Sequence, residues 1–102
     1  MITADWTSRE AEIVAPPARD DIVVEALDGE VVFGDPLSGM AYHLNETAHA
    51  VWRRCDGRTT TREIATALTI DYDVDFDRAL DDTEQLVVFF AEAGLTKHEP
   101  DA

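Results

Sequence analysis

The fold is decided by residues 40–95, MAYHLNETAHAVWRRCDGRTTTREIATALTIDYDVDFDRALDDTEQLVVFFAEAGL. At its start the large apolar side chains of Met40, Tyr42 and Leu44 alternate with smaller or polar ones. A period of two places alternate side chains on opposite faces of a β-strand. Further along, apolar residues recur at helical spacing between capping and turn residues. We therefore predict one strand followed by three amphipathic helices.

Capping residues set the limits of these helices. Asn45 is a suitable N-cap for the first helix, and Thr60 with Glu63 forms a capping box for the second. Either Asp73 or Asp75 caps the third. Apolar residues at i, i+3, i+4 and i+7 predict the buried faces. In helix order these are Ala48, Val51, Trp52 and Cys55, then Ile64, Ala67 and Leu68, then Phe76, Leu80, Thr83, Val87 and Phe90.

Upstream of this stretch the sequence predicts a β-hairpin. Residues 22–27 and 31–33 are rich in β-branched side chains, and Asp28-Gly29 between them is a typical two-residue turn. A second turn at 35–39 leads into the strand at 40–44. The three strands form an antiparallel meander with the third strand at an edge. The expected class is therefore α+β and winged helix-turn-helix-like, with a three-stranded antiparallel sheet followed by three helices.

The length of 102 residues is sufficient for one domain. Pro16-Pro17 interrupts regular structure, so residues 1–20 are expected to form a flexible arm containing Trp6 and a short strand near Ile13-Val14. Residues 21–95 are expected to form the domain, and residues 96–102 a flexible tail.

Charge narrows the range of partners. The 22 Asp and Glu residues outnumber 8 Lys and Arg residues, which gives a formal net charge of −14. Such a chain is expected to avoid nucleic acid and anionic membranes, because both are bound through basic residues. With one cysteine, no signal-like N-terminus and no long apolar run, we expect a cytoplasmic protein.

The sequence gives little indication of catalysis, and we predict no enzyme activity, no cofactor and no metal site. The three histidines lack the spacing of a ligand pair, and a second cysteine for zinc is missing. The acidic run at 71–75 lacks the glycine and terminal glutamate of a calcium loop, and helix capping explains it better. Cys55 is expected to pack at a helix end.

Several segments together resemble the PqqD family of RiPP precursor-peptide recognition elements. They are LNETA at 44–48, CDG at 55–57, TTTREIA at 59–65, YDVD at 72–75 and AGL at 93–95. The resemblance covers roughly residues 21–95. It implies a non-catalytic protein that binds the leader of a ribosomally made precursor peptide. The leader would be presented to a modifying enzyme such as a radical SAM protein, a cyclase or a leader peptidase.

The resemblance also implies a place for the peptide, as a strand added to residues 40–44 and facing the third helix. An edge strand offers unpaired backbone groups, and pockets for alternate side chains then provide selectivity. A second apolar line on the third helix, with Leu86 and Phe89, could receive an apolar anchor. The expected peptide-binding residues are Met40, Ala41, Tyr42, His43, Leu44, Arg78, Asp82, Leu86 and Phe89.

Two other functions remain open at this point. One is an accessory protein–protein interaction subunit of the same fold, for example beside a kinase. The other is a winged-helix DNA-binding regulator, although Arg78 is the only basic residue of the third helix. The exposed edge strand could also pair two copies of the chain into a homodimer.

Overall fold

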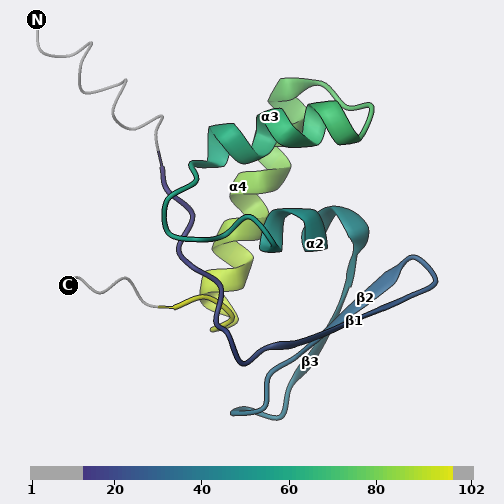
Figure 1. The fold of residues 1–102 in the computed structure, drawn as a ribbon, viewed down its shortest axis with the longest axis vertical. Coiled ribbons are helices and arrows are strands. Elements are labelled where there is room, and N and C mark those ends of the chain that lie inside the picture. Colours follow the sequence, from purple (N-terminus) through teal and green to yellow (C-terminus); the bar gives the residue numbers. More distant parts are fainter. Residues whose placement is uncertain (1–12, 98–102) are drawn as a thin grey trace, which may run out of the picture.

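The computed structural model describes residues 13–97. Its elements follow in the order β1 (Val23–Leu27), β2 (Glu30–Gly34), β3 (Ala41–Asn45), α2 (Glu46–Trp52), α3 (Thr61–Asp71) and α4 (Phe76–Glu92). The strands form one antiparallel sheet in the order β1-β2-β3. Figure 1 shows the three helices gathered on one side of this sheet. The predicted α+β class, with three strands followed by three helices, is confirmed for the described part of the chain.

The first hairpin turns at the predicted dipeptide. Asp28 and Gly29 both have positive φ, at 40° and 82°, as a type I′ turn requires. The resulting register pairs Leu27 with Glu30 at the turn. It also turns the side chains of Val31 and Phe33 inward, where both are buried.

The helices begin at predicted caps. The Asn45 side chain accepts a hydrogen bond from the Ala48 amide at 2.9 Å. Thr60 and Glu63 form the complete capping box of α3. Of the two candidates for α4, Asp75 is the cap, and its carboxylate accepts from the Arg78 amide. These side chains satisfy backbone N–H groups that have no partner within the helix.

An aromatic cluster joins the sheet to the helices. The Phe33 ring of β2 lies edge-on to Trp52 of α2, with centroids 5.1 Å apart, and Phe90 of α4 lies 5.2 Å from Trp52. Most residues of the predicted helix faces are buried around this cluster, but Ala67, Phe76 and Leu80 are only partly buried. Thr61 and Ala65, which were not predicted, are buried. Leu95 folds back over the end of α4, and its amide donates to the Phe90 carbonyl at 2.8 Å.

The segment 13–19 differs from the flexible arm expected there. Its backbone bonds to distant parts of the chain: Ala15 donates to Thr59, Ala18 to Cys55, and Arg19 to Leu95, at 2.8–3.1 Å. Figure 1 shows this segment running past the helices towards β1. The predicted short strand is present only as a single bridge between Val14 and Thr60. The cause is tertiary pairing, which overrides the local effect of Pro16-Pro17.

A side-chain clamp fixes the end of this segment. The Arg19 guanidinium donates two hydrogen bonds to the buried Asp35 carboxylate, both at 3.0 Å, and a third to the Gly94 carbonyl. These charge-assisted bonds hold the pKa of Asp35 at about 2, below its ordinary value of 3.8. The start of the expected tail is also held, because the Lys97 amide donates to the Pro17 carbonyl. Trp6 and most of the tail lie outside the described residues.

Candidate functional site

Strand β3 has one paired edge and one open edge. It pairs with β2 from Gly34↔Ala41 to Glu30↔Asn45, and no strand within residues 13–97 pairs with its other side. The N-terminal segment, which could have covered this edge, runs instead along the loop between α2 and α3 and past the end of α4. The predicted edge position of the third strand is therefore confirmed among the described residues.

The backbone of β3 faces outward at alternate residues. The Asp35 amide donates to the Met40 carbonyl at 2.9 Å, so the backbone carbonyl of Met40 points towards the end of β2. In an antiparallel ladder the bonded set alternates, so Tyr42 and Leu44 also face β2. The backbone groups of Ala41 and His43 therefore point towards the open edge. Each offers one N–H donor and one C=O acceptor.

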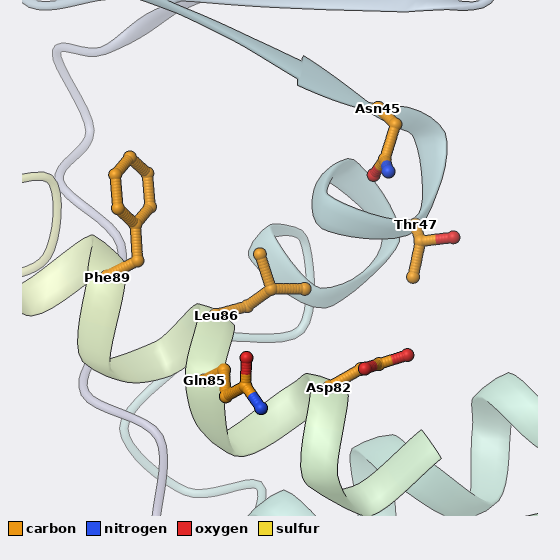
Figure 2. A pocket seen from close by; sticks show the side chains of 6 residues that line it. All are labelled: Asn45, Thr47, Asp82, Gln85, Leu86 and Phe89. Carbon is orange, nitrogen blue, oxygen red and sulfur yellow. The ribbon is translucent and has the colours of Figure 1, made fainter. Parts of the chain in front are cut away.

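A groove lies beside this edge, between the end of β3 and α4. It has a volume of about 410 Å³ and is lined by Asn45, Thr47, Asp82, Gln85, Leu86 and Phe89. Figure 2 shows Asp82, Leu86 and Phe89 on successive turns of α4, with Thr47 on α2 across from Asp82. The Phe89 ring lies edge-on to Tyr42 of β3, with centroids 5.8 Å apart. The groove is therefore apolar at its Phe89 end and polar at its Asp82 end.

The structure brings three of the four predicted helix residues together. Asp82, Leu86 and Phe89 line the groove, whereas Arg78 does not. The Arg78 side chain is largely exposed, and its Nε atom lies 4.0 Å from a carboxylate oxygen of Asp82. Arg78 therefore lies outside the groove, next to Asp82 at its polar end.

The predicted strand residues occupy two sides of the sheet. Tyr42 and Leu44 are partly buried and pack against the core. Ala41 and His43 are exposed on the other face, where a His43 ring nitrogen lies 3.5 Å from the Glu30 carboxylate. Met40 precedes β3 and lines a second hollow together with Ala41.

Three groove residues, Asn45, Thr47 and Gln85, are absent from the sequence-based prediction. Asn45 was identified there only as a helix cap, and its side chain does bond the Ala48 amide. Because that cap sits at the junction of β3 and α2, it also lies at the mouth of the groove. Thr47 and Gln85 could not be found without knowing how α2 packs beside α4.

Reactive side chains lie away from the groove. Burial raises the pKa of the Cys55 thiol to about 12, and its Sγ donates to the Val51 carbonyl. Burial also lowers the pKa of the His49 imidazole, which lies edge-on to Phe33. Within residues 13–97 no group of three His, Cys, Asp or Glu side chains is placed to hold a metal ion. No helix in that range is both long and apolar enough to span a membrane.

Comparison with solved structures identifies the same fold elsewhere. A lasso peptide synthetase B1, complexed with the leader peptide, is 28% identical with a TM-score of 0.69; the alignment covers 83% of this chain and 100% of that one. TbiB1 in complex with the TbiA(β) leader peptide is 22% identical with a TM-score of 0.67, over 83% and 99% of the chains.

A third similar structure is the solution structure of the PqqD truncation of PqqCD from Methylobacterium extorquens, described as a stand-alone RiPP recognition element. It is 21% identical with a TM-score of 0.64, over 86% of this chain and 97% of that one. No curated protein matches the chain. The family model of coenzyme PQQ synthesis protein D (PqqD) matches residues 30–95, more than half of the sequence. The protein therefore belongs to the PqqD family, as its sequence motifs indicated.

Proposed function

We propose that this protein is a non-catalytic adaptor that holds the leader of a ribosomally synthesised precursor peptide. The leader binds as a fourth strand on the open edge of β3 and is presented to a modifying enzyme or leader peptidase. The observation that carries the proposal is the unpaired β3 edge beside the groove of α4. Further support comes from the 28%-identical synthetase B1, which was solved with a leader peptide.

Backbone pairing supplies the first part of the binding energy. A guest strand satisfies the donors and acceptors of Ala41 and His43, which have no strand partner on that side within residues 13–97. Such bonds exchange protein–water for protein–protein contacts, so each contributes about 0.5–1.5 kcal/mol. They hold the guest peptide in an extended conformation but discriminate little between peptide sequences.

Side chains of the guest supply selectivity. Alternate residues of a strand point to the same side, so every second guest residue faces the groove. Leu86 and Phe89 fit an apolar anchor, and Asp82 fits a basic or hydroxyl group. A fully buried apolar anchor contributes about 1.5–3 kcal/mol. Such anchors add to the strand bonds, and together they must exceed an association cost of about 4–15 kcal/mol.

The first test is titration with the leader peptide encoded beside the gene, followed by fluorescence anisotropy. Saturable binding in the micromolar range or below is expected. Absence of saturation at tens of micromolar, for the product of every short reading frame nearby, would contradict the proposal.

A proline scan of β3 tests the mode of binding. Proline lacks the N–H donor and is tolerated at sheet edges. Ala41→Pro and His43→Pro should weaken leader binding by about tenfold or more while the protein stays folded. Tyr42→Pro is the matched control, since it removes a bond to β2 and should instead lower the stability of the fold. Full affinity in both edge variants would rule out strand addition at β3.

The enzyme class is a finer part of the proposal. A radical SAM protein, a cyclase or a leader peptidase would each require an extended leader held in a fixed register. Genes that neighbour this one would discriminate between them, and a kinase-like neighbour would favour the accessory-subunit alternative. Self-pairing through the β3 edge remains a prediction, and it would compete with leader binding for the same backbone groups.

A further inference from the structure

The face of the sheet turned away from the helices is exposed and partly apolar. Pairing sets Val23, Gly34 and Ala41 side by side across the three strands. In β2 the side chains of Val31 and Phe33, at odd spacing from Gly34, point to the opposite face and are buried. Figure 1 shows the helices gathered on one side of the sheet, and the exposure of Val23 agrees with an uncovered opposite face.

A hollow lies on this outer face above Gly34. It has a volume of about 280 Å³, and its lining includes Val23, Pro36, Met40 and Ala41. Val23 and Met40 are 59% and 52% exposed, although both are large and apolar. The hollow exists because the middle residue of the cross-strand row has no side chain, while its neighbours rise on either side.

The backbone conformation does not explain the glycine at position 34. Gly34 is not among the residues with positive φ. A Cβ atom placed on it would lie 3.7 Å from the Val23 carbonyl oxygen, an ordinary van der Waals contact. A larger residue would therefore fit the fold, and what glycine provides at this position is space on the outer face.

Arg19 lies beside the hollow but is ion-paired with Asp35, one of its lining residues, and with Asp21, so the remaining charge around the hollow is mainly negative. Residues 20–52, which include the whole sheet, contain seven acidic residues and no Lys or Arg. Six of the seven are exposed; the buried one is Asp35. Val23, Glu25 and Leu27 are two residues apart along β1 and so share one face, and Glu30 pairs with Leu27. Both glutamates therefore lie on the outer face with the hollow. The fitting ligand is therefore an apolar group surrounded by basic residues.

We propose that this outer sheet face docks the peptide-modifying enzyme, which inserts an apolar side chain into the hollow above Gly34 and places basic residues around it. The inference rests on the proposed function, because a leader strand on β3 would extend the same face. An enzyme seated there touches both the adaptor and the outward side chains of the leader.

Charge disfavours the other occupants of this face. A second copy would bring acidic residues against acidic residues, and like charges in an interface cost affinity. The segments 1–12 and 98–102 each contain more acidic than basic residues, so they are poorly suited to cover it. A basic partner protein would be attracted to this face, whereas a second copy or a terminal segment would be repelled.

The test measures two affinities in the full-length protein. The probes are the purified modifying enzyme encoded beside the gene and, separately, its leader peptide. Gly34→Val fills the hollow and should weaken enzyme binding by about tenfold or more, with leader affinity unchanged. Ala26→Val is the matched control, because it adds two carbon atoms, one fewer than Gly34→Val, at an exposed position on the opposite face of the sheet. It should leave both affinities within about twofold of the parent.

A substitution that changes charge on the outer face tests the same docking surface without filling the hollow. Glu25→Lys should weaken enzyme binding, whereas Glu92→Lys at the end of α4 should not. Parental enzyme affinity should also fall as salt rises, since surface charge pairs are screened. Unchanged enzyme binding in both Gly34→Val and Glu25→Lys would overturn the inference, as would a homodimer in sedimentation that Gly34→Val dissociates. Failure of the leader titration alone would instead remove the proposed function.

Discussion

Two extended segments of this protein have opposite hydrogen-bonding states. Residues 13–19 are bonded along their length to the loop between α2 and α3 and to residues after α4, and Arg19 bonds the Asp35 side chain. Strand β3 is bonded on one side only, and Ala41 and His43 face solvent on the other. The satisfied segment closes the core, whereas the unsatisfied one is free for a guest. Stability and binding should therefore respond to different substitutions.

The largest effect is expected from Phe90→Ala. Phe90 is fully buried and contacts both Phe33 and Trp52, so its removal leaves a cavity in the aromatic cluster. The free energy of unfolding should fall by about 3–5 kcal/mol, measured by urea denaturation. A loss below about 1 kcal/mol would mean that the aromatic cluster is not the centre of the core.

The neighbouring residue separates binding from stability. Phe89→Ala should weaken leader binding by roughly tenfold or more, because Phe89 borders the groove and is only half-buried. Its effect on unfolding should be smaller than that of Phe90→Ala. Val88→Ala is the control, since Val88 is 54% exposed and does not line the groove. Equal affinity losses at positions 88 and 89 would argue against a specific anchor site.

Acid should weaken the closed segment through Asp35. Its pKa is held at about 2 by the Arg19 hydrogen bonds, below the ordinary 3.8. The resulting stabilisation is fully present above pH 4 and is lost as the pH falls towards 2. The urea midpoint of the parent should therefore drop more steeply between pH 4 and pH 2 than that of Asp35→Asn. If the urea midpoints of the parent and Asp35→Asn changed equally with pH, the Arg19–Asp35 bonds would contribute nothing to stability. The control is Asp73→Asn, at an exposed position, which should show the same pH dependence as the parent.

The smallest effect is expected from Thr83→Val in α4. The Thr83 hydroxyl is buried and has no hydrogen-bond partner among the described residues. Replacing it with a methyl group of similar size should raise stability by up to about 1 kcal/mol. Thr69→Val provides the contrast, because the Thr69 hydroxyl donates to the Thr66 carbonyl. Its replacement should be neutral or destabilising, and a gain at both sites would point to helix propensity instead.

Local patterns explain which features could be predicted from the sequence. The Asp28-Gly29 turn and the caps at Asn45, Thr60 and Asp75 depend on residues within one turn of each other. All appear in the structure at these positions. The alternation in β3 likewise predicted that Tyr42 and Leu44 face the core. It was wrong for Met40, which precedes the strand and is exposed.

Features that depend on distant contacts were missed. Ala15 bonds to Thr59 and Arg19 to Asp35, and no periodicity connects residues so far apart. The groove was predicted in part, since Leu86 and Phe89 share one side of α4. Arg78 lies outside its lining because each residue along a helix rotates by about 100°, so small errors in phase change the face.

Amide hydrogen exchange at β3 tests the central claim most directly. In the free protein the amides of Tyr42 and Leu44, which face β2, should be protected, whereas those of Ala41 and His43 should exchange rapidly. Saturating leader peptide should slow exchange at Ala41 and His43, because a guest strand then accepts their hydrogen bonds. Rapid exchange at both amides in the presence of bound leader would contradict strand addition at this edge.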